Sequence, residues 1–267
     1  DAKREMEWPS PWGKGFPGWH IECSAMSAKY LGQPFDIHAG GIDHIPVHHE
    51  NEIAQSEAAY GKPLAEYWVH GEFLAVDDKK MSKSLGNLYL IDDIIKQGIN
   101  PLAFRYLCLG AHYRTKLNFT WESLDGANNA LKSIYKIVRG LPLLRQGFGG
   151  QAKIGCAELE QKFLDRINDD LDTPGALAIV WEMLKSENPS SAKAESLLKF
   201  DEVLGFGIKL YLGKKIKIPA EVAKLIETRA AARKEKNWKL SDELRDKIAE
   251  LGFLVEDTPE GTKVEEK

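Results

Sequence analysis

Residues 80–84 read Lys-Met-Ser-Lys-Ser, so two lysines flank small hydroxyl side chains. Polar residues precede this segment and Gly86-Asn87 follows it, which predicts a loop rather than a helix or strand. Lysines on such a loop can neutralise the charge that builds on a triphosphate as pyrophosphate departs, and the hydroxyl groups add hydrogen bonds. We therefore expect phosphate chemistry at Lys80, Ser82, Lys83 and Ser84, with an ordinary solvated loop as the alternative.

A thiol, an imidazole and a carboxylate form a second candidate set: Cys23, His48 and Glu52. His48 and Glu52 are four residues apart in a predicted helix, so their side chains leave the same face. All three groups are zinc ligands, and three protein ligands with an open position are typical of a functional zinc site. Taken alone, a surface ion pair and a cysteine in core packing explain the same residues.

A glycine pair followed by an acid, Gly40-Gly41-Ile42-Asp43, ends the first predicted strand. Glycine lets the backbone approach a ligand closely, and a carboxylate beside it suits a ribose hydroxyl or an ammonium group. Gly41 and Asp43 are therefore candidates for nucleotide or substrate contact. A plain turn is the alternative.

The elements that must position these side chains follow from periodicity. A helix is predicted over 19–31, a strand over 35–38, a helix from Pro46 to about residue 60, and strands over 67–70 and 72–76. Alternating strands and helices indicate an α/β sheet with functional loops at the strand ends. Residues 1–18, rich in Pro, Gly and Trp, predict an irregular segment.

From residue 93 onward the pattern is mainly helical. Helices are predicted over 101–112, 121–139, 156–170, 174–186 and 192–203, with a flexible connector over 140–155. A third unit follows, with helices over 220–236 and 241–251, Ser241 as the N-cap of the second, a strand over 253–256 and a frayed charged end over 260–267. The predicted domains are 1–120, 121–213 and 214–267.

Composition describes a globular chain of 267 residues, 43% hydrophobic and 28% charged, with three cysteines at wide spacings. No run of about 18 apolar residues and no basic-then-apolar leader occurs, so we expect a reduced, cytoplasmic protein with no membrane contact. The net charge of −4 conceals a basic segment over 214–239, with nine Lys/Arg against three acids. That segment either attracts a phosphate backbone or forms a solvated helix face.

The loop over 80–84 resembles the signature loop of class I aminoacyl-tRNA synthetases. Residues 18–26, 36–38 and 48–56 closely resemble the cysteinyl-tRNA synthetase family. The resemblance implies a Zn²⁺ ion that binds the thiolate of substrate cysteine, with Cys23, His48 and Glu52 as three of its ligands. The family's fourth ligand, a cysteine in its N-terminal half, has no match here. Trp19 and His38 are implied as walls of the side-chain pocket, and Gly41, Asp43 and Lys83 as ATP or substrate contacts.

The implied fold is a Rossmann-like class I catalytic domain, an α-helical bundle of the anticodon-binding type and a small C-terminal unit. Residues 112–119, 170–177, 227–239 and 257–262 resemble later family motifs in the correct order. The implied partners are cysteine, ATP with Mg²⁺ and tRNA(Cys), and we expect a monomer. Residues 44–47 differ from those common at this place in the family, and no His-x-Gly-His occurs. The chain is therefore expected to be a later portion of a synthetase and inactive alone.

Zinc explains how such an enzyme would select cysteine. Serine differs from cysteine by one atom, and a hydrophobic pocket rejects it only modestly. Zinc binds a thiolate strongly and a neutral hydroxyl weakly, so a direct bond supplies the discrimination. Two alternatives stay open: a paralogous ligase that joins cysteine to an amino sugar in thiol-cofactor synthesis, and a non-catalytic tRNA-binding fragment. A zinc hydrolase is disfavoured because no His-Glu-x-x-His is present.

Overall fold

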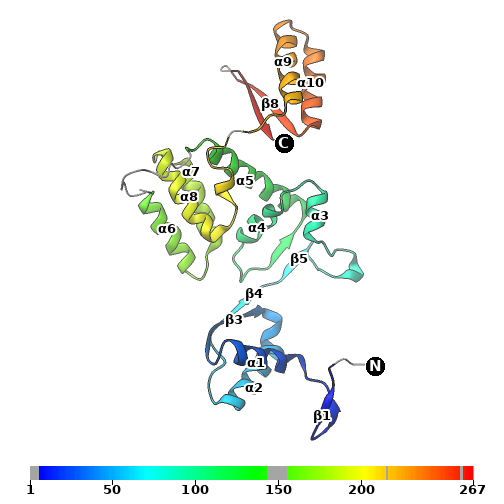
Figure 1. Ribbon diagram of the computed structural model, residues 1–267, viewed down its shortest axis with the longest axis vertical. Helices are drawn as coiled ribbons and strands as arrows, with labels where there is room; N and C mark the ends of the chain where they lie inside the picture. Colours follow the sequence, from blue (N-terminus) through cyan, green and yellow to red (C-terminus); the bar gives the residue numbers. More distant parts are fainter. Residues whose placement is uncertain (1–5, 143–154, 215, 259–260, 267) are drawn as a thin grey trace.

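The computed structural model describes residues 6–142, 155–214, 216–258 and 261–266 (Figure 1). Most of the connector expected over 140–155 lies outside these residues. The N-terminal segment, expected to be irregular, contains a short antiparallel hairpin of β1 (Trp8–Ser10) and β2 (Gly13–Gly15). Its turn closes at Gly13, whose φ of +108° favours glycine, and the Ser10 hydroxyl donates to the Gly13 carbonyl at 2.7 Å.

The first α/β layer consists of α1 (Trp19–Tyr30), β3 (Phe35–Gly41), α2 (Glu50–Tyr60) and β4 (Ala65–Gly71). Strands β3 and β4 pair in parallel, with Gly40 opposite His70. The helix predicted from Pro46 begins differently: the 3₁₀ turn η1 (Ile42–His44) leads into the π-helical turn η2 (Ile45–His49) before α2. This wider turn buries the neighbouring side chains of His48 and His49, which are 5% and 3% exposed.

A second small sheet has the order β6-β5-β7, formed by β5 (Leu74–Val76), β6 (Lys79–Lys80) and β7 (Leu117–Phe119). Asp77 and Asp78 both have positive φ and make the tight turn between β5 and β6. The 3₁₀ turn η3 (Lys83–Leu85), α3 (Ile91–Lys96), which was not predicted, and α4 (Pro101–Leu109) follow. One core joins the sheet to these helices, formed by Val76, Ile94, Ala103, Phe119 and Leu124.

The predicted helical bundle is present. It contains α5 (Trp121–Arg139), α6 (Ala157–Asn168), α7 (Thr173–Lys185), α8 (Ser190–Leu204) and the 3₁₀ turn η4 (Ile208–Leu210). Thr120 caps α5, since its hydroxyl accepts from the Ser123 N–H at 3.0 Å. Leu124 of α5 belongs to the sheet core, whereas Leu131 and Val138 belong to the bundle core. Helix α5 therefore contributes to two cores.

The C-terminal unit packs α9 (Ala220–Lys234) and α10 (Trp238–Glu250) against the hairpin of β8 (Phe253–Thr258) and β9 (Gly261–Glu266). Two expectations were wrong here. Ser241 lies buried inside α10, and Asn237 is the cap because its side chain accepts from the Leu240 N–H at 3.2 Å. The chain end is not frayed over 261–266, because antiparallel pairing with β8 supplies the hydrogen bonds that a charged segment lacks alone.

Along the long axis of the molecule, the layer of α1, α2, β3 and β4 lies at one end and the C-terminal unit at the other, with the bundle between them (Figure 1). None of the helices in the described residues has the length and apolar character needed to span a membrane. The domain boundaries at 120/121 and 213/214 stay a prediction.

Candidate functional site

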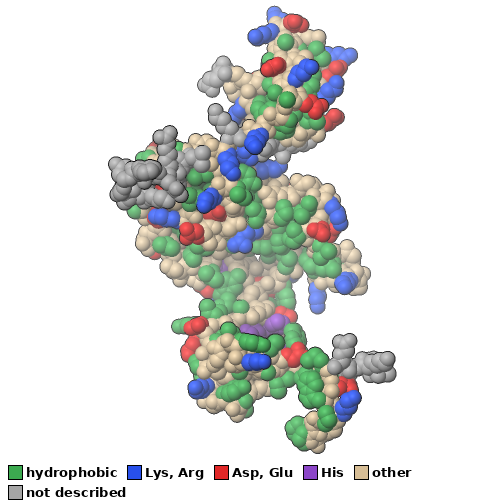
Figure 2. Space-filling model, in the orientation of Figure 1, with side chains coloured by type: hydrophobic (Ala, Val, Ile, Leu, Met, Phe, Trp, Pro, Cys, Tyr) green, Lys and Arg blue, Asp and Glu red, His purple; other side chains and the backbone are tan. Residues whose placement is uncertain are grey.

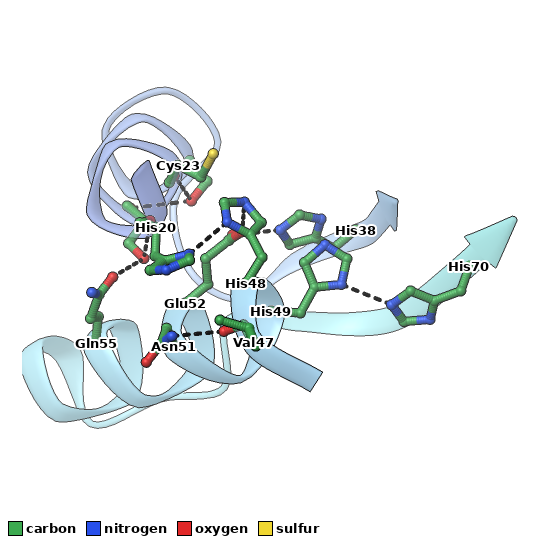
Figure 3. Close-up of polar contacts among 12 residues, drawn as sticks. His20, Cys23, His38, Val47, His48, His49, Asn51, Glu52, Gln55 and His70 are labelled. Carbon is green, nitrogen blue, oxygen red and sulfur yellow. Dashed lines mark hydrogen bonds and ion pairs between the residues drawn. The ribbon is translucent and has the colours of Figure 1, made fainter. Parts of the chain in front are cut away.

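The predicted zinc ligands lie together in the first layer (Figure 3). Cys23 comes from α1, His48 from the π-helical turn and Glu52 from α2, and their donor atoms all lie within 4.8 Å of one another. Glu52 is fully buried, and its Oε1 lies 2.7 Å from His48 Nε2. Although this distance is short, Oε1 has no partner in hydrogen-bond geometry within the described part of the chain. A buried carboxylate oxygen facing an imidazole in this way is suited to share a cation with it.

The second oxygen of Glu52 is held by His38. Its Oε2 lies 2.7 Å from His38 Nε2, and the His38 ring stacks on Trp68 with centroids 4.5 Å apart. His38, expected as a pocket wall, therefore contacts the carboxylate directly. Trp19, the other expected wall, is 58% exposed and lies with its ring centroid 4.2 Å from that of His48.

Further histidines contact this group, and we call His20, His38, His48, His49 and His70 together the histidine cluster (Figure 3). His20 Nδ1 lies 2.7 Å from His48 Nδ1, and His49 Nδ1 lies 2.8 Å from His70 Nε2. Sequence reasoning did not assign these supporting roles. The doublet of His48 and His49 was the available signal, but its meaning depends on the π-helical turn that buries both rings.

Gly40 leaves the space that the packed histidine rings occupy. A Cβ at Gly40 would lie 2.6 Å from His49 Cε1 and 2.9 Å from His44 Nδ1, closer than side chains tolerate. At Gly41 an added Cβ would lie 2.4 Å from Asp43 Oδ1, so the exposed Asp43 carboxylate folds over the glycine. The glycine pair is therefore needed for close packing, and Asp43 lies at the carboxyl end of β3.

Burial governs the protonation of the cluster. It raises the pKa of the Cys23 thiol, with the negative charges of Glu52 and Glu22 acting in the same direction. It lowers the pKa of His48 despite the opposing effect of Glu52, and lowers that of His49 to about 4. The imidazoles of His48 and His49 are thus neutral at pH 7, the form that binds metal, and the Cys23 thiol needs a cation to lose its proton.

The lysine loop, residues 80–84, is held by contacts of its own. Lys80 and Lys83 are exposed, and Met81 packs into the sheet core. Asn87, expected only as a turn residue, holds the loop together: its Oδ1 accepts from the Ser82 N–H at 2.9 Å and its Nδ2 donates to the Lys80 carbonyl at 3.1 Å. The described residues show no hydrogen bond or ion pair between this loop and the histidine cluster.

Comparison with known families matches two regions. Residues 1–129 match the tRNA synthetases class I (C) catalytic domain, and residues 217–264 match the cysteinyl-tRNA ligase anticodon binding domain. The chain is 49% identical to the Burkholderia lata cysteine–tRNA ligase 1 over 265 residues, covering 99% of this chain and 55% of that protein. It is 45% identical to the Caldicellulosiruptor saccharolyticus cysteine–tRNA ligase, covering 99% and 60% respectively. The chain belongs to the cysteinyl-tRNA synthetase family.

This member of the cysteinyl-tRNA synthetase family spans between 55% and 60% of the length of these two relatives. A solved structure shares its fold: the LeuRS of Agrobacterium radiobacter K84, in a ternary complex with tRNA and LeuAMS, has a TM-score of 0.53 at 14% identity. That match covers 76% of this chain and 33% of LeuRS. The predicted α/β class with a helical bundle is therefore confirmed. The anticodon-binding match lies in the C-terminal unit, whereas the role assigned to 121–213 stays a prediction.

The residues present fit the zinc ion that the cysteinyl-tRNA synthetase resemblance implies. Tetrahedral zinc with bonds of about 2.0–2.3 Å places its ligand atoms about 3.3–3.6 Å apart. The thiol, imidazole and carboxylate atoms here lie within 4.8 Å of one another, so small side-chain rotations suffice. His38 and His49 form a second possible ligand group, but it uses the same Glu52. The two groups therefore compete for one carboxylate.

Proposed function

We propose that this chain provides the cysteine-selecting and tRNA-binding parts of a cysteine–tRNA ligase. In that reaction ATP and cysteine form cysteinyl-adenylate and pyrophosphate, and the cysteinyl group passes to the 3′ end of tRNA(Cys). The observation that carries the proposal is that the Cys23 thiol and the His48 imidazole both lie close to the buried carboxylate of Glu52. Sequence identity of 40–49% to cysteine–tRNA ligases supports it.

Each protein group at the proposed zinc site has a defined task. When bound, zinc supplies a direct bond to the substrate thiolate, which serine cannot match. His38 orients the Glu52 carboxylate, and His20 orients the ring of His48. Trp19 covers His48 from the exposed side and, with His38, would wall the pocket for the cysteine side chain. These contacts hold the ligand atoms before the substrate arrives.

Activation is assigned to the lysine loop. Lys80 and Lys83 would stabilise the charge on departing pyrophosphate, with the hydroxyls of Ser82 and Ser84 assisting, while ATP brings Mg²⁺. Gly41 and Asp43 would contact the ribose or the substrate amine. Because Asn87 fixes two backbone groups of the loop, the loop can close as one preformed piece.

Recognition of tRNA is assigned to residues 217–264, with the bundle over 121–213 supporting it. The match of 217–264 to an anticodon-binding model favours a tRNA substrate over an amino sugar. We further propose that the protein acts as a cytoplasmic monomer.

Two measurements test zinc binding and cysteine selection separately. Purified chain should contain one zinc, measured by mass spectrometry, and lose it in Cys23→Ser and Glu52→Gln. Cys108→Ser is the matched control, because Cys108 lies outside both possible ligand groups and should leave zinc content unchanged. The zinc-loaded chain should melt at a higher temperature with cysteine and not with serine. Equal shifts with both amino acids would contradict selection through the thiol.

A further inference from the structure

The carboxylate of Glu52 faces a different histidine with each of its two oxygens. Oε1 lies 2.7 Å from His48 Nε2, and Oε2 lies 2.7 Å from His38 Nε2. Two groups of possible metal ligands therefore meet at this one side chain. Cys23, His48 and Glu52 form what we call the thiol set, and His38, His49 and Glu52 form the two-histidine set. Within each set the ligand atoms lie within 4.8 Å of one another.

His49 is oriented to bind a cation through one of its ring nitrogens. Its Nδ1 lies 2.8 Å from His70 Nε2, and this contact leaves His49 Nε2 available. Metal-bound histidines usually have such a partner on their second nitrogen, because it fixes the tautomer and the ring orientation. His48 has the same arrangement in the thiol set, with His20 Nδ1 2.7 Å from its Nδ1. The two sets are therefore built in the same way.

Gly40 keeps space open beside His49 Nε2. A Cβ at Gly40 would lie 2.8 Å from that nitrogen and 2.9 Å from His44 Nδ1, so both nitrogens border the same space. The His44 ring contacts the rings of His48 and His49, but it has no hydrogen bond among the described residues. His44 is therefore available as a fourth ligand beside the two-histidine set.

The donor atoms of the two sets favour different cations. A thiolate selects zinc and softer ions, whereas two imidazoles and a carboxylate suit Fe²⁺, Co²⁺ and Ni²⁺ as well as Zn²⁺. Glu52 and Cys23 are the only acidic groups in the two sets. Two dications would leave an excess of positive charge in a buried place, which desolvation disfavours. One chain therefore holds one ion at a time.

The two-histidine set is closed to an incoming substrate. Glu52 is fully buried, His49 is 3% exposed, and the His38 side chain is 17% exposed and stacks on Trp68. Little histidine surface is visible on the face of the molecule shown in Figure 2. An ion in this set is surrounded by protein, whereas the thiol set includes the half-buried Cys23. Only the thiol set leaves room for the thiolate of a free amino acid.

We propose that His38, His49 and Glu52 bind a divalent transition-metal ion in place of the zinc of the thiol set, and that an ion bound there blocks cysteine selection. The blocking rests on the proposed function, and it adds inhibition by metal to the same site. Ions that prefer nitrogen ligands occupy the two-histidine set when they are in excess over zinc. They also occupy it when Cys23 is removed as a ligand.

The experiment uses Co²⁺ as its probe, because a thiolate ligand gives Co²⁺ an intense charge-transfer absorption that nitrogen and oxygen ligands do not give. The full chain with Cys23→Ser, made metal-free, should bind one added Co²⁺ without this absorption. Adding His70→Gln, which removes the partner of His49, should weaken binding about tenfold, and adding His49→Asn should weaken it further. His112→Asn is the matched control, since His112 lies outside both sets, and it should change binding less than about twofold.

A second measurement tests the blocking. Excess Ni²⁺ added to the unsubstituted, zinc-loaded chain should release zinc and remove the melting shift with cysteine. His70→Gln should need about tenfold more Ni²⁺ for the same loss. Circular dichroism shows that each variant is folded, and His70→Gln keeps the comparison available if the buried His49 cannot be replaced.

Each other outcome overturns the proposal. Cys23→Ser that binds no Co²⁺ shows that the two-histidine set cannot hold an ion without the thiol. Binding that persists in both histidine variants places the ion elsewhere, and two Co²⁺ ions per unsubstituted chain contradict the competition for Glu52. Equal melting shifts with cysteine and serine would sink the proposed function, whereas Co²⁺ binding by Cys23→Ser does not depend on any substrate.

Discussion

Arg229 forms a bidentate pair of hydrogen bonds with Asp257: Nη1 donates to Oδ1 at 2.9 Å and Nη2 donates to Oδ2 at 2.7 Å. The pair joins α9 to β8; Arg229 is 3% exposed, whereas the Asp257 carboxylate remains partly open to solvent. A bidentate pair of this kind is stronger than an ordinary surface ion pair. It is the main polar contact that we identify between the helices and the hairpin of the C-terminal unit.

We predict that acid weakens this unit. The hydrogen bonds from Arg229 are the largest cause that lowers the pKa of Asp257 to about 2, compared with about 3.9 for an unfolded aspartate. Because the folded pKa is the lower one, the stabilisation is complete above about pH 5 and is lost as the pH falls toward 2. Asp257→Asn should cost about 1–2 kcal/mol at pH 7. Hydrogen exchange over 220–258 measures it, with the exposed Asp246→Asn as control.

We predict that Gly40→Ala disrupts the histidine cluster. The new Cβ would displace His49 and His44, so the free energy of unfolding should fall by about 1–3 kcal/mol and zinc content should drop. Gly71→Ala is the matched control, because it lies at the end of the partner strand with nothing within 4 Å of an added Cβ. Denaturant unfolding and metal analysis of both proteins check this. Equal effects in the two variants would refute the packing argument.

We predict that Asn87→Ala loosens the lysine loop. The Ser82 N–H and the Lys80 carbonyl both lose their side-chain partner, at about 1 kcal/mol for each bond. The Ser82 amide should then exchange with solvent about fivefold faster. Ser84→Ala leaves both Asn87 contacts in place and should leave this rate unchanged. A rate that does not move in Asn87→Ala would show that the backbone alone holds the loop.

We predict that Arg114→Gln has a local effect without a global one. Arg114 Nε donates to Asp170 Oδ2 at 2.7 Å, and Tyr113 donates to Asp170 Oδ1 at 2.6 Å, which joins the segment before β7 to the α6–α7 turn. Both charged side chains are substantially exposed, so the melting temperature should hardly change. Amides over 170–173 should exchange faster, because Asp170 and Leu171 have positive φ and need external support. Lys116→Gln is the control.

The sequence predicted best where local rules and packing agree. Helix α5 has the bounds that were predicted, 121–139; its apolar residues recur on one face, and the structure adds Thr120 as its cap. Ser241 misled because a residue suited to capping also fits inside a helix. Strand β9 was missed because its charged residues become a strand only when β8 pairs with them. The four-residue spacing of His48 and Glu52 predicted that their side chains lie together, and in the structure their ligand atoms and that of Cys23 lie within 4.8 Å of one another.

Other features could not be predicted because they depend on contacts between distant segments. His70 gains its meaning from the β3–β4 register, and Asn87 from the path of the lysine loop. Lys132, Lys136 and Arg139 of α5 line one pocket together with Lys263 of the C-terminal hairpin, which their spacing in the sequence does not reveal. Hydrophobic periodicity carries no information on such tertiary neighbours.

The double role of α5 has a consequence for cooperativity. Leu124 seals the core of the small sheet and Leu131 that of the bundle, and one continuous helix joins the two. Neither core can melt without fraying the helix that the other needs, so sheet and bundle form a single folding unit. The core of Val222, Ile248 and Phe253 shares no residue with either. Heating should therefore produce a separate transition for the C-terminal unit, and a protease should release it while the rest stays folded.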